Sequence, residues 1–205
     1  MKRVLTAVCL VMLCWPLTAP GVDHNPPADS VLPELDAHDI TRGEFTQTRR
    51  LPELSRPLRS SGRFVHDVDH GIIWQVLEPA PSTLVITPRG LYQDGEHHSG
   101  ANPMTTLRPV FRALFSGDMA RLEDHFEVTA GEAGEGWTLE LKPRDSSLAA
   151  ALQKIILSGD DYPQQVVIKD GDGGRTELRF AAIEHPDTLD EQSQQAFERA
   201  HKTAP

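Results

Sequence analysis

The feature that most strongly constrains the fold of this chain is a series of short segments in which polar and apolar residues alternate. Residues typical of tight turns separate these segments. From residue 43 to residue 93 the alternation has a period of two, which indicates β-strands. Strands are expected at about 43–51, 60–68, 72–77, 82–88 and 91–93. Residues 67–71 have the composition of a tight turn. Gly71 favours such a turn, because glycine can adopt a positive φ. Strands so close along the chain favour an antiparallel meander.

A helical pattern then interrupts the strands. Asn102 can cap a helix that begins at Pro103, where a missing N–H group costs nothing. Gly117 is expected to end this helix, and a short second one follows through residue 123. Large apolar residues recur at helical spacing from residue 104 to residue 119, which indicates a strongly apolar stripe: Met104, Leu107, Phe111, Leu114, Phe115 and Met119.

Strands resume in the second half of the chain. They are expected at about 126–129, 137–141, 165–169 and 176–183, with a helix from Asp145 or Ser146 that carries Leu148, Leu152 and Ile155. A polar helix at about 188–201 closes the chain. An antiparallel sheet can leave one face in water, but it has to cover the other, and the inserted helices are the candidates. The predicted fold class is therefore α+β: a single curled antiparallel sheet, an incomplete β-barrel, covered by inserted helices.

The N-terminus has the pattern of a secretory signal peptide. Lys2 and Arg3 precede an apolar run from residue 4 to residue 15, which Pro16 breaks. About a dozen apolar residues are too few to span a bilayer, so an uncleaved anchor is the less favoured alternative. Cleavage is expected after Gly21. The predicted organisation is a signal peptide at 1–21, a flexible N-terminal arm at 22–42 and one folded domain at 43–205 that includes the C-terminal helix.

Composition limits the partners. The chain has 30 acidic and 20 basic residues and a net charge of −10, whereas nucleic acids and anionic membranes favour Lys and Arg. Neither is therefore expected as a partner. Cys9 and Cys14 both lie in the signal peptide, so the mature chain is expected to have no thiol chemistry. The prediction is a soluble periplasmic monomer.

No motif indicates catalysis or a cofactor. The mature chain has no Gly-x-Ser-x-Gly elbow, no His-Glu-x-x-His motif and no Walker A loop. His97 and His98 are adjacent and point to opposite faces of an extended chain, so a solvated loop is favoured over a metal site. The Asp-Gly-rich turn at 170–174 lacks the ligand at position five and the bidentate Glu at position twelve of a calcium loop, so a hairpin turn is favoured. A non-enzymatic protein without metal or cofactor is predicted. Of the three functional classes considered, a carrier, an interaction module and a lipid-directed hydrolase, the hydrolase is the least favoured.

Several short motifs occur in the order found in LolA-type outer-membrane lipoprotein carriers. The series opens with Gly43-x-Phe45-x-Gln47, Gly62-x-Phe64, Trp74 and Pro79, and continues with segments at 114–118, 136–143, 166–170 and 176–180. Over about residues 43–183 the chain therefore resembles this family. The carriers have an Arg just before the Trp of the third strand, where this chain has Ile73. The chain is thus more similar to a divergent branch of the fold, whose members are linked to exporters of the resistance-nodulation type.

The resemblance implies a periplasmic carrier that binds acyl lipid or lipoprotein in an apolar half-barrel cavity and moves it from the inner toward the outer membrane. It also implies three partners: the cargo, an inner-membrane export machine (an ATP-driven releasing complex or a resistance-nodulation-type exporter) and an outer-membrane acceptor. The alternative function is an interaction or scaffold module that binds a protein partner of an export system. The candidate lipid-binding residues, for which an ordinary packed core is the alternative, are Phe45, Phe64, Trp74, Leu84, Ile86, Leu107, Phe111, Leu114, Phe115, Trp137 and Leu139.

Overall fold

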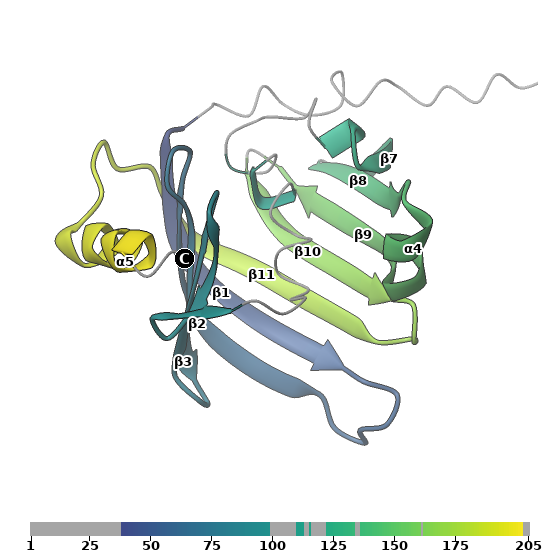
Figure 1. The fold of residues 1–205 in the computed structure, drawn as a ribbon. Coiled ribbons are helices and arrows are strands. Elements are labelled where there is room, and N and C mark those ends of the chain that lie inside the picture. Colours follow the sequence, from purple (N-terminus) through teal and green to yellow (C-terminus); the bar gives the residue numbers. More distant parts are fainter. Residues whose placement is uncertain are drawn as a thin grey trace, which may run out of the picture.

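The fold is built around one large antiparallel sheet (Figure 1). The computed structural model describes residues 38–98, 110–112, 115, 122–133, 136–160 and 162–202. The strands within these ranges are β1 (Ile40–Arg50), β2 (Leu58–Asp67), β3 (Gly71–Glu78), β4 (Ser82–Thr87), β5 (Gly90–Gln93), β6 (Glu96–His98), β7 (Phe126–Ala133), β8 (Gly136–Pro143), β9 (Leu152–Gly159), β10 (Pro163–Asp170) and β11 (Arg175–Glu184).

The strand order is β6-β5-β4-β3-β2-β1-β11-β10-β9-β8-β7. Strands that follow one another in the chain pair with each other, except β6 and β7, and β1 also pairs with β11, which joins the two halves of the sheet. β6 and β7 are the two edges, so the sheet curls without closing (Figure 1). The predicted single curled antiparallel sheet is confirmed.

Two helices have clear positions relative to the sheet. α4 (Ser146–Ala151) lies beside β8 and β9, and α5 (Glu191–Lys202) follows the last strand. The cap of α4 is as predicted, because a side-chain oxygen of Asp145 accepts hydrogen bonds from the backbone N–H groups of Ser147 at 3.0 Å and Leu148 at 2.9 Å. Within the described residues, no helix has the length and apolar character needed to cross a membrane.

The prediction of a helix that continues to Ile155 is wrong. The helix ends at Ala151, and Leu152 begins β9. Leu152, Ile155 and Leu157 all become buried in the core of the sheet, although the first two also fit a helical spacing. β9 pairs with β8 on one side and β10 on the other, and this pairing outweighs the local pattern.

The chain differs from the predicted boundaries in two further places. β1 begins at Ile40, three residues before Gly43, and Ile40 and Thr41 are buried. The pattern around His97 and His98 predicts a loop, whereas residues 96–98 form the exposed edge strand β6, paired with β5. The predicted signal peptide, most of the N-terminal arm and most of the helix at 103–116 lie outside the described residues.

Two Gly-x-Phe motifs fit against each other at the centre of the sheet. In the pairing of β1 with β2, Gly43 lies opposite Phe64 and Phe45 lies opposite Gly62. A Cβ atom added to Gly43 would lie 2.9 Å from the ring of Phe64, and one added to Gly62 would lie 2.9 Å from the ring of Phe45. Each glycine therefore makes room for the aromatic ring of the neighbouring strand. The motif that carries the family resemblance has this packing role.

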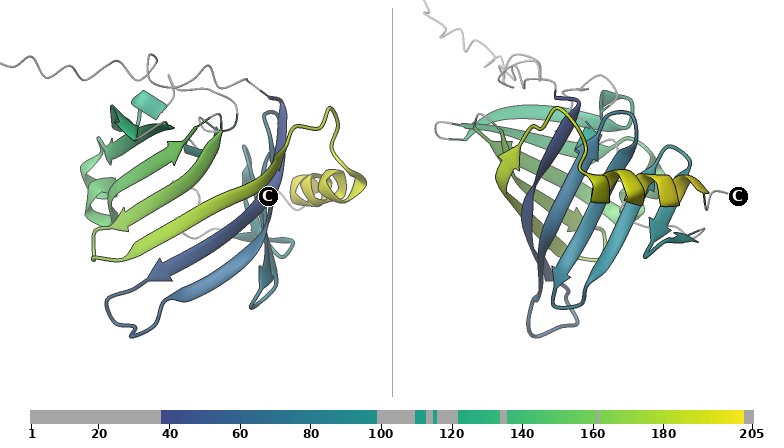
Figure 2. Two further views of the ribbon diagram at one scale, coloured as in Figure 1. Left: turned by 180° about the vertical axis from the view of Figure 1, so that it is seen from behind. Right: turned by 90° about the vertical axis from the view of Figure 1, so that its left-hand side faces the viewer.

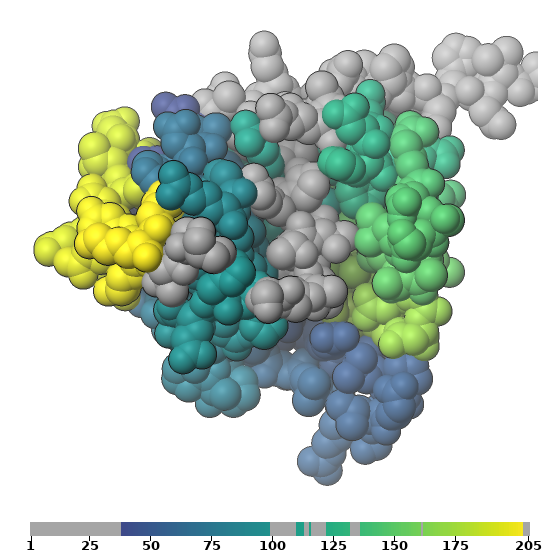
Figure 3. Space-filling view, in the orientation of Figure 1, coloured from purple at the N-terminus to yellow at the C-terminus, as the bar shows by residue number. Residues whose placement is uncertain are grey.

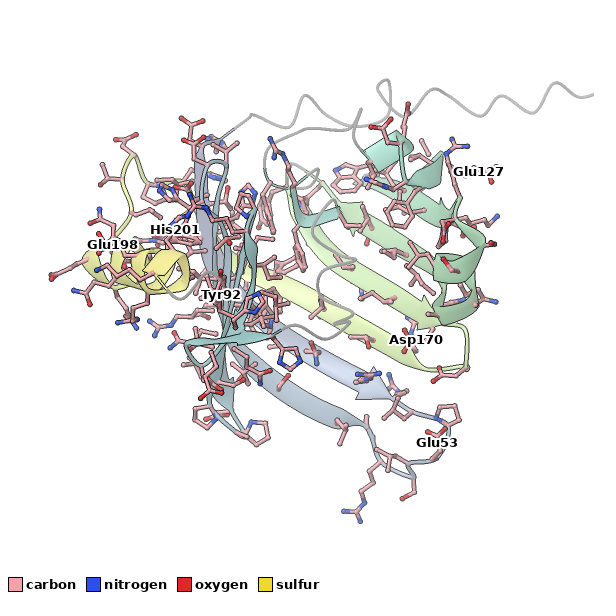
Figure 4. All side chains as sticks on the ribbon, viewed as in Figure 1. Glu53, Tyr92, Glu127, Asp170, Glu198 and His201 are labelled. Carbon is pink, nitrogen blue, oxygen red and sulfur yellow. The ribbon has the colours of Figure 1, made fainter. Side chains whose placement is uncertain are left out.

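The outer face of the N-terminal half of the sheet is covered by α5. Figure 2 (right) shows α5 running across these strands, and the space-filling view shows it packed directly against them (Figure 3). Phe197 and Ala200 of α5 pack on Ile73, Val85 and Tyr92. Glu198 lies on the side of the helix away from the sheet (Figure 4). The sheet thus has an apolar layer on its inner face and a smaller one under α5.

Candidate functional site

The inner face of the sheet gathers the residues that the sequence singled out. Nine of the eleven candidates lie in the described part of the chain, and all nine belong to one apolar cluster: Phe45, Phe64, Trp74, Leu84, Ile86, Phe111, Phe115, Trp137 and Leu139. Leu84 is half-buried, and the other eight are buried. Leu107 and Leu114 lie outside the described residues. The period-two pattern therefore assigned these strand residues to the correct face.

Aromatic rings form the centre of this inner cluster. Phe45 stacks on Trp74 with ring centroids 3.8 Å apart, and Phe64 lies 6.2 Å from Trp74. Phe180 of β11 meets Phe64 edge-on at 5.3 Å. These rings come from four strands that neighbour one another in the sheet, so they form a continuous aromatic surface.

A helical segment, defined by residues 110–112 and 115, packs its own rings onto this surface. Phe111 lies 5.5 Å from Trp74, and Phe115 lies 4.9 Å from Phe64. Phe111 is 2% and Phe115 6% exposed. The space between Trp74 and Phe111 is therefore filled by the protein's own side chains. An acyl chain could occupy this surface only where the rings of the segment give way.

The other half of the inner face is mainly aliphatic. Alternate residues of β8, β9 and β10 point into it, and they are fully buried or nearly so: Leu139, Leu141, Ile155, Leu157, Val166 and Ile168. Trp137 lies in the same half, and its indole N–H donates a hydrogen bond to the backbone oxygen of Asp160 at 2.7 Å. The inner face is thus apolar across its whole width.

The opposite face of this half is charged and faces water. Lys154 donates a hydrogen bond to Glu140 at 2.5 Å, and this contact is the main reason that the pKa of Glu140 is lowered. Glu177 accepts a hydrogen bond from Arg179 at 2.9 Å, which likewise lowers its pKa. Glu127 projects from the edge strand β7 (Figure 4). Such a sheet has one wet face and one apolar face.

Sequence reasoning missed one polar residue on the inner face. His66 is 3% exposed, and its ring lies 5.8 Å from that of Phe115. Burial lowers the pKa of His66 to about 4, while Asp67 raises it and Arg112 lowers it. The period-two pattern could have placed His66 on the inner face, because Phe64 is two residues away.

A groove on the outer face was also missed. It has a volume of about 620 Å³ and lies between α5 and the strands β1 to β5. Its apolar lining comes from Val65, Ile73, Val85, Ala196 and Ala200, and its charged lining includes Arg42, Glu44, Arg63, Asp94 and Glu184. Ile73, which stands where the resembled carriers have Arg, therefore faces α5 rather than the helical segment on the inner face. Within the described ranges, no group of three or more His, Cys, Asp or Glu residues could hold a metal ion.

The fold and the inner face define a class of protein: an open, curled antiparallel sheet whose apolar inner face is packed against a helical segment. The sequence matches the family described as "Outer membrane lipoprotein carrier protein LolA-like" over residues 22–197. The chain therefore belongs to the LolA-like family, and the resemblance seen in its motifs is confirmed. Its functional class is that of a carrier-type binding module.

Solved structures are similar to this chain at low sequence identity. The LolA superfamily protein NE2245 from Nitrosomonas europaea is 14% identical, with a TM-score of 0.44 over 80% of this chain and 92% of that one. The complex of MucA and MucB from Pseudomonas aeruginosa shows 13% identity and a TM-score of 0.42, over 78% of this chain and 56% of that one. No curated protein matches the sequence.

Proposed function

We propose that this protein is a periplasmic carrier that binds acyl lipid, free or attached to a lipoprotein, on the inner face of its sheet. The main support for the proposal is the continuous apolar surface of the inner face. Phe111 and Phe115 pack there against the aromatic rings of the sheet. The family match over residues 22–197 supports it and begins directly after the predicted signal peptide. Binding and release need no chemistry, so the protein is proposed to have no catalytic role.

The energetics favour such a carrier. Each buried CH₂ group contributes about 0.8 kcal/mol, so an acyl chain of sixteen carbons resists transfer to water by roughly 12 kcal/mol. A dry apolar surface recovers most of this free energy. Exposing the side chains of Phe111 and Phe115 would cost about 2–3 kcal/mol each, which one acyl chain offsets.

The helical segment, residues 110–112 and 115, is the moving part in this proposal. Its two phenylalanines occupy the surface in the empty protein, and an incoming acyl chain replaces them against Trp74 and Phe64. When the cargo leaves, the rings return and close the surface. The empty and loaded states thus both keep the inner face dry.

The proposed partners follow from the path of the cargo. An inner-membrane export machine, either an ATP-driven releasing complex or a resistance-nodulation-type exporter, would load the protein, and an acceptor at the outer membrane would receive the lipid. The remaining candidate residues, Leu107 and Leu114, are proposed to belong to the same lipid-binding surface.

A quenching experiment tests this function. The mature chain has two tryptophans, so Trp137→Phe leaves Trp74 as the single fluorescent reporter at the centre of the inner face. Dibromostearic acid, which carries a quencher on its acyl chain, should quench Trp74 in a saturable manner. Unbrominated stearic acid should reverse the quenching. A flat response at Trp74, and also in the matched variant Trp74→Phe that reports from Trp137, would contradict binding on the inner face.

The outer groove favours a second function, binding of a protein partner. It combines apolar residues with arginine and carboxylate side chains, a mixture that is common at protein interfaces. A partner held there would be displaced by Ile73→Asp but not by Phe111→Asp. The reverse pattern is expected for lipid, so the two variants separate the functions.

A further inference from the structure

His66 is a buried polar residue in an apolar surface. It lies on β2, two residues from Phe64, and its register partners are Thr41 on β1 and Ile72 on β3. Phe115 and Arg112 of the helical segment are its neighbours from above the sheet. With 3% of its surface exposed, His66 belongs to the inner face on which the acyl chain is proposed to bind.

One nitrogen of this histidine has no partner. Nδ1 of His66 is buried and makes no hydrogen bond within the described part of the chain. The neighbouring carboxylate, Asp67, points to the other face and is engaged in the turn after β2. Its Oδ1 accepts hydrogen bonds from the backbone N–H groups of Asp69 at 2.9 Å and His70 at 2.8 Å, and it contacts the ring of His70 at 2.8 Å.

The other buried polar group nearby is also engaged. The hydroxyl oxygen of Thr41 lies 3.2 Å from Nδ1 of His185. A buried polar atom without a partner costs about 1–3 kcal/mol, and an apolar residue at position 66 would avoid that cost. The unsatisfied nitrogen therefore points to a ligand atom that completes the site.

We propose, building on the lipid-carrier function, that His66 hydrogen-bonds the carbonyl oxygen that joins an acyl chain to its head group. The cargo is then an ester- or amide-linked acyl lipid rather than a plain hydrocarbon. The aromatic and aliphatic residues hold the chain, and His66 fixes how deep the chain enters.

A neutral imidazole suits this contact. Burial keeps the pKa of His66 near 4, so at neutral pH the ring can donate one hydrogen bond without carrying a charge. The carbonyl oxygen of an ester or amide is an acceptor only. A neutral donor in an apolar wall matches such a group.

Two lipids that differ only at this carbonyl test the proposal. Palmitoyl lysophosphatidylcholine has an ester carbonyl, and its hexadecyl ether analogue has none. Both are titrated, below their micelle concentrations, as competitors of a fluorescent fatty acid on the full mature protein. The wild-type protein should bind the ester about fivefold more tightly than the ether, as one hydrogen bond predicts.

Variants of His66 separate a ligand contact from a structural role. His66→Leu should bind the ether at least as well as the wild type does and should lose the preference for the ester. His66→Asn, whose amide can stand in for Nδ1, should restore part of that preference. His70→Leu, a histidine on the exposed turn, should keep the wild-type ratio.

The experiment distinguishes failure of the proposed role of His66 from failure of the proposed carrier function. If the wild-type protein binds both lipids equally, and His66→Leu does too, the carrier function stands and the role of His66 is refuted. If the wild-type protein binds neither lipid, both proposals are contradicted. An unfolding transition of His66→Leu at or above the wild-type midpoint confirms that the variant is folded.

Discussion

Lowering the pH should destabilise this protein through the protonation of His66, in addition to the loss of carboxylate contacts. Burial lowers the pKa of His66 from 6.5 to about 4, partly opposed by Asp67 and reinforced by Arg112. Between these two values the unfolded chain binds a proton that the folded chain does not. The contribution of His66 to stability is therefore fully present above about pH 6.5 and is lost as the pH falls toward 4.

The size of this effect follows from the two pKa values. At about 1.4 kcal/mol for each pH unit, the free energy of unfolding should fall by roughly 3 kcal/mol between pH 7 and pH 4. His66 is almost fully buried, so solvent screening reduces this figure little. Such a loss is a large fraction of the stability of an ordinary domain.

Urea unfolding at pH 7, 6, 5 and 4 measures the effect. The comparison protein is His66→Asn, which has the same sheet but no titrating group at this position. Glu140 and Glu177, whose pKa values are lowered by their hydrogen-bond partners, also lose stabilising contacts in acid, but they do so equally in both proteins. The wild-type curve should therefore fall about 3 kcal/mol further than the curve of the variant. Parallel curves would refute the assignment of a buried neutral His66.

Four further substitutions test the packing and the site. Phe111→Asp should abolish acyl-lipid binding and leave a folded sheet, whereas Phe197→Asp, equally buried but under α5, should loosen that helix and leave lipid binding intact; lipid titration and circular dichroism measure both. Gly62→Ala should destabilise the protein by about 3 kcal/mol in urea, because its Cβ would lie 1.9 Å from the backbone oxygen of Gln75. Gly95→Ala should cost only about 1 kcal/mol, because φ is +89° but the space around it is open.

The strands of the first half were predictable from local patterns. In β1 and β2 the alternation of buried and exposed residues matches the alternation of inner and outer faces. In β3 to β5 both faces carry apolar residues, because Ile73, Val85 and Tyr92 pack under α5. Turn residues such as Gly71, with φ of 122°, mark where one strand ends and the next begins.

The structure of the second half was harder to predict from the sequence, because it depends on contacts between residues that are far apart in the chain. Leu152 and Ile155 fit a helix by spacing alone, and only the pairing of β9 with two neighbours makes them strand residues. The docking of α5 on Ile73 joins residues more than a hundred positions apart, so no local window contains it. His66 lies on the same face of the sheet as Phe64. The sequence does not show, however, whether a polar residue in an apolar pattern has a hydrogen-bond partner.

Mass spectrometry of the protein purified from periplasm tests the central claim most directly. Native spectra should show a mass above that of the mature chain, and the organic extract should contain ester- or amide-linked acyl lipid at close to one molecule per protein. Phe197→Asp should carry the same lipid, and Phe111→Asp should carry none. A wild-type protein that is free of lipid in this measurement, and that gives no quenching of Trp74 by the brominated fatty acid, would contradict the account of the inner face as a lipid-binding surface.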